Sequence, residues 1–390
     1  MPILFLIVFV DLVGFGLIIP LLPFYAQEFH ATPAQIGWLF ASYSLTQLLF
    51  APLLGRLSDR VGRRPGLLVS IAGGIAAYVL FAEARSFLVL LLARALSGVA
   101  ASNYSIAQAY VADVTPAEER SQAMGMVIGA SFGLGFILGP ALGGIIGLIR
   151  PGDHSAVAFT AAALGGLNLV LATLWLKESL PVEERGVHRW EGWLDLHSFA
   201  GTWRNAPLRG LFVLSFLVTF CFSMMETSFA LFCQSRFGFG SSGVAGFFVF
   251  IGVLLVIVQA SLVRPLVRRY GERALIVYGI VLMAAGLFLL PAAPAPWLLL
   301  PALTLLAFGS GVHNPASLGL LSLLARSDAQ GGTSGVYRSF GALGRILGPL
   351  AGPWMFEAVG IRSPFWAAGG LMLVTLVYAW DFLRRVAAPV

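Results

Sequence analysis

The chain of 390 residues is strongly hydrophobic and carries few charges. Hydrophobic residues make up 58% of it, charged residues only 11%, and the mean hydropathy is +0.88. A soluble globular protein cannot bury so much apolar surface and still cover itself with polar groups, so the composition excludes one. The formal net charge of +6 forms no basic patch interleaved with aromatic residues, which argues for membrane topology and against nucleic acid as a partner.

Apolar runs close to the roughly 20 residues that cross a hydrocarbon core recur along the whole chain. The first six predicted spans lie at 3–25, 35–54, 66–82, 86–111, 122–147 and 155–176. After a polar stretch, six more lie at 209–233, 242–263, 274–292, 297–325, 332–357 and 364–383. We therefore predict an all-α polytopic membrane protein with twelve transmembrane helices. Its parts would be an N-terminal six-helix bundle (1–176), a cytoplasmic central loop (177–207) and a C-terminal six-helix bundle (208–390).

Basic residues gather in alternate loops. The loops on the side of the termini hold Arg56, Arg60, Arg63, Arg64, Arg120, the cluster in 177–209, Arg264, Arg268, Arg269, Arg273, Arg326, Arg384 and Arg385. The opposite loops hold only Arg85, Arg150, Arg236 and Arg362. The positive-inside rule then places both termini and the central loop in the cytoplasm. We expect a multi-pass protein of the cell's inner (cytoplasmic) membrane.

Two features recur at the same offset of 209 residues. The segment GFILGPALGG, which begins at Gly135, reappears as GRILGPLAGP from Gly344. The turn GRLSDRVGRR at 55–64 falls on RPLVRRYGER at 264–273. One internal duplication explains both features and predicts two pseudo-symmetric bundles, an arrangement that places a substrate site between the halves near the membrane midplane.

The turn GRLSDRVGRR carries the most specific motif of the chain. Gly62 can adopt positive φ, and the four-residue spacing of Asp59 and Arg63 suits an ion pair. Here the chain resembles the major facilitator superfamily, whose signature G-x-L-x-D-R-x-G-R-R/K is filled completely. The resemblance implies the major facilitator fold and a conformational latch in which Asp59 docks against a helix of the other half. The latch residues would be Gly55, Asp59, Arg60, Gly62, Arg63 and Arg64.

A plain topology anchor is the alternative role for this turn, since its arginines also attract anionic headgroups. The second copy has Arg268 where Asp59 would align. Only the first copy can therefore latch through this carboxylate.

Two further segments resemble drug:proton antiporters. The fifth predicted span fills G-x-x-x-G-P-x-x-G-G, a motif typical of the antiporter branch, with Gly135, Gly139, Pro140 and Gly143. The opening D-x-x-G-x-G-x-x-x-P-x-x-P, which starts at Asp11, is similar to the first helix of twelve-span drug exporters, including tetracycline exporters. This likeness favours export over uptake, although close helix packing alone would also explain the glycines.

Five charged residues are expected inside spans, where a charge costs roughly 2.5 to 3.5 kcal/mol and needs a cavity or a partner. They are Asp11, Arg94, Glu226, Arg338 and Arg345, of which Arg338 lies close enough to the cytoplasmic end to serve mostly as a topology residue. Helical rise places Asp11 and Arg94 at depths that differ by roughly 6 Å. We expect Asp11 to be a proton-coupling site with Arg94 as its tuning partner, with a structural ion pair as the alternative. Arg345 falls near the same depth. Glu226 would be a second proton site or a contact for a cationic substrate, unless it reaches to the outer water.

Polar residues in the spans that line the cavity of this family are the candidate substrate contacts. They are Asn103, Tyr104, Gln108, His313 and Asn314, together with Met225 beside Glu226. For the polar residues the alternative is a hydrogen bond between helices, and for Met225 it is contact with lipid.

These observations predict a secondary active transporter that exports small amphipathic or lipophilic compounds in exchange for protons, as in multidrug efflux. The alternative is a proton-coupled sugar, metabolite or lipid transporter. The only lysine, Lys177, is not in a phosphate-binding G-x-x-x-x-G-K-[ST] loop, and no hydrolase motif occurs, so neither an ATP-driven pump nor an enzyme is expected. We expect no metal and no cofactor, the proton gradient as energy source, and a monomer that meets only protons, substrate and lipid.

Overall fold

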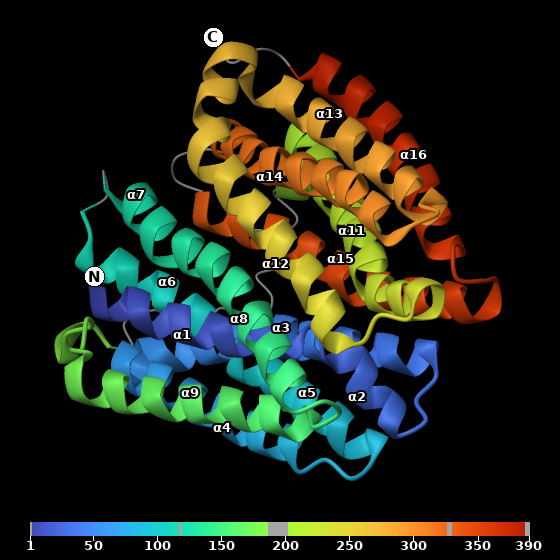
Figure 1. Cartoon of the computed structure of the whole chain (residues 1–390). Coiled ribbons are helices and arrows are strands. Elements are labelled where there is room, and N and C mark those ends of the chain that lie inside the picture. The colour runs from blue at the N-terminus through green and yellow to red at the C-terminus, as the bar shows by residue number, and fades with distance from the viewer. Residues whose placement is uncertain (1, 117–118, 186–201, 326–329, 387–390) are drawn as a thin grey trace. The chain divides into compact units, whose positions relative to one another are not determined.

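The computed structural model describes residues 2–116, 119–185, 202–325 and 330–386, and these residues form helices and the turns between them (Figure 1). Part of the predicted central loop, 186–201, lies outside the described residues. Contacts between Cα atoms divide the chain into two compact units. Unit 1 comprises 1–32, 38–193 and 239–252, and unit 2 comprises 33–37, 194–238 and 253–390.

Most of the first half of the chain belongs to unit 1. Its helices are α1 (Pro2–Ile18), α2 (Leu22–Glu28), α3 (Pro33–Val61), α4 (Arg63–Ala82), α5 (Phe87–Ala100), α6 (Asn103–Val114), α7 (Arg120–Met124), α8 (Ala130–Ile149) and α9 (His154–Trp175). A π-helical turn, Gly125–Gly129, joins α7 to α8, and a 3-10 turn lies at Val182–Glu184.

The second half of the chain supplies the helices of unit 2. They are α11 (Ala206–Phe237), α13 (Val263–Ala292), α14 (Leu299–Leu324), α15 (Gln330–Ala358) and α16 (Ser363–Arg385). Between α11 and α13 lie α12 (Ser241–Ile257), which begins in unit 1 and ends in unit 2, and a second π-helical turn, Val258–Leu262. A 3-10 turn, Pro296–Leu298, precedes α14.

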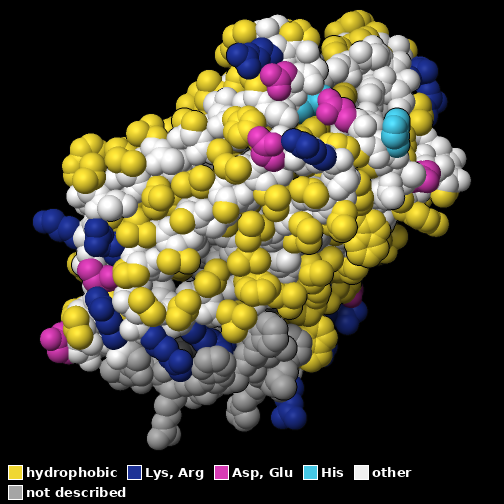
Figure 2. All heavy atoms as spheres, turned by 90° about the horizontal axis from the view of Figure 1, so that it is seen from below, with side chains coloured by type: hydrophobic (Ala, Val, Ile, Leu, Met, Phe, Trp, Pro, Cys, Tyr) yellow, Lys and Arg dark blue, Asp and Glu magenta, His cyan; other side chains and the backbone are white. Residues whose placement is uncertain are grey.

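Helices occupy all twelve segments that the sequence predicts as spans. Among the described residues, nine helical stretches are long and apolar enough to cross a membrane, or ten when the bent pair α1 and α2 counts as one. One of them, Ser241–Ala292, has 52 residues, enough for two crossings at about 20 residues each. It contains a kink at Gly271, where φ is 75°. On the face in Figure 2, hydrophobic side chains cover a broad central area and charged side chains lie at its margins.

Two spans are broken. The axes of α1 and α2 differ by 47°, because Pro20 and Pro23 at the junction lack the N–H that a continuous helix needs. The predicted span 86–111 is interrupted at Ala101 and Ser102, so that Asn103 becomes the first residue of α6. No proline marks this second break, but Ser and Asn side chains compete for backbone hydrogen bonds and weaken a helix locally.

In each unit a helix pair packs through a row of glycines that recur every fourth residue, called a glycine stripe here. The stripes are Gly135, Gly139 and Gly143 on α8 and Gly344, Gly348 and Gly352 on α15. In unit 1, α8 packs on α1 so closely that a Cβ on Gly139 would lie 2.6 Å from the Cα atom of Gly16. In unit 2, α15 packs on α11, and a Cβ on Gly348 would lie 2.6 Å from the carbonyl oxygen of Phe220. Figure 1 shows both pairs side by side. Gly139 and Gly348 are related by the offset of 209, so the repeat in sequence is a repeat in packing.

Candidate functional site

Asp11 lies in the middle of α1 and is joined to α6. Its side chain is half-buried, and its carboxylate accepts a hydrogen bond from the side-chain amide of Asn103. Asn103 is itself 9% exposed and stands at the break between α5 and α6. The structure therefore brings together a predicted proton site and a predicted polar contact residue.

Tyr78 of α4 is a third member of this group and was not expected from the sequence. Its hydroxyl lies against α1, where a Cβ on Gly14 would be 3.1 Å from the hydroxyl oxygen. Gly14 is one helical turn from Asp11, so glycine here makes room for a polar group near the carboxylate. The Tyr78 hydroxyl lies within electrostatic range of both Asp11 and Arg94. The only signal in the sequence is a lone tyrosine in an apolar span.

Arg94 of α5 is 2% exposed. Its guanidinium carbon lies 4.6 Å from the centre of the Tyr43 ring, a cation–π contact that favours a buried arginine. The Nε atom of Arg94 is buried without a hydrogen-bond partner. In the described part of the chain Arg94 and Asp11 form no ion pair, and both instead lie within electrostatic range of Tyr78. The role of Arg94 as a tuning partner of Asp11 stays a prediction.

Unit 2 contains a separate pair of charges in its spans. Glu226 of α11 is half-buried, and the charge of Arg345 on α15 acts on it. The glycine stripe of α15 brings these two helices together, so the pair follows from the packing. Met225, the neighbour of Glu226, is 4% exposed.

The other candidate substrate contacts differ in their surroundings. His313 is 1% exposed, with Nδ1 3.5 Å from the carbonyl oxygen of Ile276 and Nε2 3.3 Å from the Ser317 hydroxyl. Both ring nitrogens thus meet groups of α13 and α14. Asn314 is exposed. Tyr104 and Gln108 are half-buried on α6, the helix that carries Asn103.

The turn between α3 and α4 is held by a network of ion pairs. Arg63 pairs with Asp59 at 2.5 Å, as their spacing predicts, and with Asp113 at the end of α6 at 3.0 Å. Gly62 has φ of 116°, which only glycine adopts without strain. Arg60 is exposed at the end of α3.

Glu178, just beyond α9, completes this network. Its carboxylate accepts hydrogen bonds from the backbone N–H groups of Arg63 at 2.8 Å and Arg64 at 3.3 Å. The Arg64 side chain also donates to the carbonyl oxygen of Thr173 at 2.7 Å. The first residues of the central loop are therefore hydrogen-bonded to the turn GRLSDRVGRR at 55–64.

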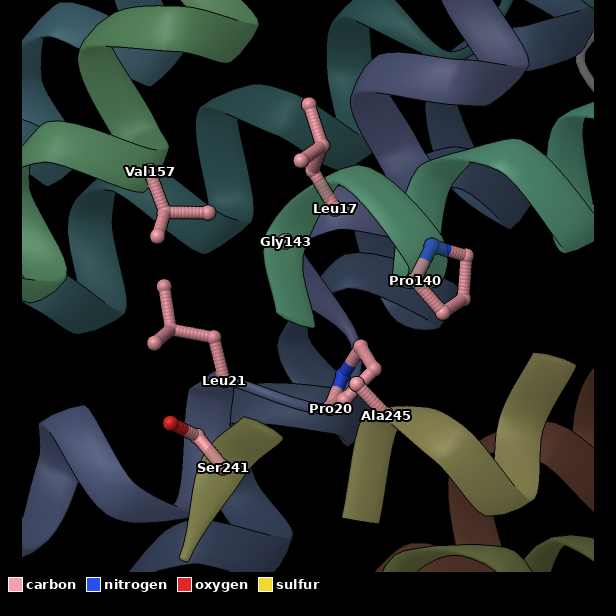
Figure 3. A pocket seen from close by; sticks show the side chains of 8 residues that line it. All are labelled: Leu17, Pro20, Leu21, Pro140, Gly143, Val157, Ser241 and Ala245. Carbon is pink, nitrogen blue, oxygen red and sulfur yellow. The ribbon is translucent and has the colours of Figure 1, made fainter. Parts of the chain in front are cut away.

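A narrow pocket lies at the bend between α1 and α2. Figure 3 shows the side chains that line it, which come from α1, α8, α9, α12 and the bend itself: Leu17, Pro20, Leu21, Pro140, Gly143, Val157, Ser241 and Ala245. Apart from the Ser241 hydroxyl the lining is apolar and offers no group for chemistry. No group of three or more His, Cys, Asp or Glu side chains suited to a metal ion occurs within the described residues.

A family model described as Major Facilitator Superfamily matches residues 4–345 and 260–389. The chain belongs to the major facilitator superfamily. It is therefore a multi-pass membrane transporter that moves small molecules, and not an enzyme.

Relatives within the superfamily include drug-resistance proteins. The class E tetracycline resistance protein of Escherichia coli is 34% identical over 379 residues, which cover 95% of this chain and 92% of the relative. Multidrug resistance protein 2 of Bacillus subtilis is 32% identical over 392 residues, 98% of this chain and 95% of the relative.

Two solved structures share the fold. The human organic anion transporter MFSD10 matches with a TM-score of 0.75 and 26% identity over 97% of this chain and 98% of that one. The nucleoside transporter NupG matches with a TM-score of 0.80 over 97% and 98% of the two chains. At 16% identity, the likeness to NupG shows the fold alone.

Proposed function

We propose that this transporter exports small amphipathic or lipophilic compounds in exchange for protons. The observation that carries the proposal is the half-buried carboxylate of Asp11 in α1, held by Asn103 and placed in the electrostatic range of Tyr78. Relatives over nearly the whole chain bear the names of tetracycline and multidrug resistance proteins, which supports export of drug-like compounds.

The chemistry of a carboxylate in a span suits proton coupling. A charged side chain at the centre of a span costs roughly 2.5 to 3.5 kcal/mol, and protonation removes that charge. In the proposed cycle the outward-facing state binds a proton at Asp11 and releases the compound, and the inward-facing state does the reverse. Exchange requires that each ligand bind the two states with different affinity, because a ligand that binds both equally shifts nothing.

Glu226 and Arg345 form the second element of the proposal. Because Glu226 is half-buried and shares its surroundings with one arginine, it can act as a second proton site or as a contact for a cationic compound. One proton that crosses 100 mV supplies about 2.3 kcal/mol, so a second site would raise the gradient that the protein can sustain. We place the protein in the inner membrane as a monomer, with both termini in the cytoplasm.

Measuring proton movement tests the proposal. Purified protein is reconstituted into vesicles that hold a pH-sensitive dye, and a lipophilic cation, a tetracycline or a sugar is added outside. Wild type should release protons from the lumen as the drug enters, and Asp11→Asn should lose this release. Asp381→Asn is the matched control, since Asp381 is an exposed carboxylate paired with Arg385 at 2.8 Å.

Three results would contradict the proposal. If Asp11→Asn releases protons as wild type does, then Asp11 is not the coupling site. If no drug produces a response but a sugar does, the protein is instead a carrier of a specific solute. If the medium becomes alkaline when substrate is added, the protein is a proton symporter.

A further inference from the structure

The two copies of the duplicated turn, 55–64 and 264–273, differ in the surroundings of their arginines. In unit 1, Arg63 is 9% exposed at its side chain and meets the carboxylates of Asp59 and Asp113. Arg64 reaches Glu178 through its backbone and a carbonyl oxygen through its guanidinium. The charge of Arg63 is therefore compensated by two carboxylates within the chain.

The copy in unit 2 reverses the charges of the Asp59 and Arg63 pair, because Glu272 takes the place of Arg63. At the offset of 209, Arg268 takes the place of Asp59, and Arg264 takes the place of Gly55. The side chains of Arg264, Arg268 and Arg269 are all exposed. Among the described residues none of these three forms an ion pair.

These arginines share one hollow in the surface. The described residues that line the hollow are Arg264, Pro265, Arg268 and Arg269, and none of them is acidic. Glu272, the nearest acid in the sequence, is directed elsewhere, because its side chain packs where a Cβ on Gly319 would lie, 3.2 Å from Cγ. Within the described residues, the hollow is therefore a concentration of positive charge without a neighbouring carboxylate.

The hollow lies where an apolar helix ends. The segment FFVFIGVLLVIVQASLV, 247–263, carries no charge, and Arg264 follows it directly. The π-helical turn Val258–Leu262 comes just before the arginines and changes their rotational phase relative to α12. Tyr270 and Tyr278, 47% and 53% exposed, add the aromatic side chains that are typical of a membrane interface.

We propose that this hollow binds the phosphate headgroup of an anionic phospholipid. Guanidinium groups bind phosphate oxygens in a bidentate manner, and a headgroup at the end of a span reaches them without leaving the leaflet. Each basic residue near an anionic surface favours binding by about fivefold, so three act together strongly. Attraction of the whole loop to the membrane, as the positive-inside rule describes, requires no such hollow.

Lipid adducts on the purified full-length protein test this site. Native mass spectrometry compares dioleoylphosphatidylglycerol with dioleoylphosphatidylcholine on wild type and on the triple variant Arg264→Gln, Arg268→Gln, Arg269→Gln. Wild type should prefer the anionic lipid by about tenfold or more, and the triple variant should lose most of that preference. The double variant Arg384→Gln, Arg385→Gln, which removes two exposed arginines at the end of α16, is the control and should keep it.

Three further measurements distinguish guanidinium recognition from simple charge attraction, from misfolding and from binding of free phosphate. A triple lysine variant keeps the charge, and its loss of preference would support recognition by guanidinium groups. An unchanged thermal midpoint shows that the triple glutamine variant is folded. Equal preference in wild type and the triple variant would overturn the proposal, as would displacement of the lipid by an equal concentration of inorganic phosphate. Because binding is measured without transport, failure here leaves the proposed drug:proton exchange untouched.

Discussion

Tyr78 lies within electrostatic range of both Asp11 and Arg94. Its hydroxyl is held against Gly14, one turn from Asp11. A phenolic hydroxyl both donates and accepts a hydrogen bond, so it can adapt to a carboxylate with or without its proton. We therefore regard Tyr78 as a positioning residue for proton coupling.

Removing only this hydroxyl should change the pH dependence of transport. Tyr78→Phe keeps the ring and its packing, so folding should be retained, while the pH midpoint of drug-driven proton release should move by roughly half a unit or more, which corresponds to about 0.7 kcal/mol. Tyr278→Phe, at an exposed position in unit 2, should leave the midpoint unchanged. Coincident profiles for Tyr78→Phe and wild type would show that Tyr78 only fills space.

Glu178 should contribute more to stability than an ordinary surface acid. Its carboxylate accepts N–H groups from Arg63 and Arg64, and Arg185 lies 3.6 Å away. Glu178→Ala leaves these donors without their acceptor and should lower the free energy of unfolding by about 1 to 3 kcal/mol, measured in detergent micelles. Glu183→Ala, at an exposed position nearby, should have almost no effect. Equal effects of the two substitutions would show that the anchor is not needed for stability.

At the level of elements, the glycine stripes fix the distance between helices. A Cβ on Gly139 would meet backbone atoms of Gly16 and Val13 at 2.6 to 2.7 Å, and backbone cannot move aside as a side chain can. Gly139→Ala should therefore destabilise unit 1 by about 1 to 3 kcal/mol, seen as a lower midpoint of thermal unfolding. Gly166→Ala on α9 is the matched control, since nothing lies within 4 Å of the added Cβ. It should be neutral or stabilise by about 0.5 to 1 kcal/mol. If both variants unfold at the same temperature, the stripe tolerates a wider spacing than the structure indicates.

Local sequence signals predicted the helices well and their interruptions only in part. Pro20 and Pro23 of the opening motif are a local signal for the bend between α1 and α2, because proline removes a backbone donor wherever it occurs. The break at Ala101 and Ser102 has no such residue, and the hydropathy of the span continues across it. Glu178 could not be recognised because its partner Arg63 lies 115 residues away, and the fold alone brings them together.

At the level of the whole molecule, the duplication is visible in backbone geometry as well as in sequence. Gly62 and Gly271, related by the offset of 209, both have positive φ, 116° and 75°. The copies retain the turn and the glycine stripe but differ in their charges, as Asp59 and Arg268 illustrate. Parallel repeats of this kind predict that the two turns lie on the same side of the membrane.

Labelling of single cysteines should reveal that topology. Cys221 and Cys233 are both 0% exposed, so the natural cysteines form a silent background for an impermeant maleimide. In intact cells Arg150→Cys should be labelled, because its loop is predicted to face outward. Arg60→Cys and Arg269→Cys should be labelled only after permeabilisation, since each lies in one copy of the cytoplasmic turn. The reverse pattern would invert the predicted orientation. Labelling of the two turns from opposite sides would mean that the repeats are antiparallel, which would contradict the parallel duplication inferred from the offset of 209.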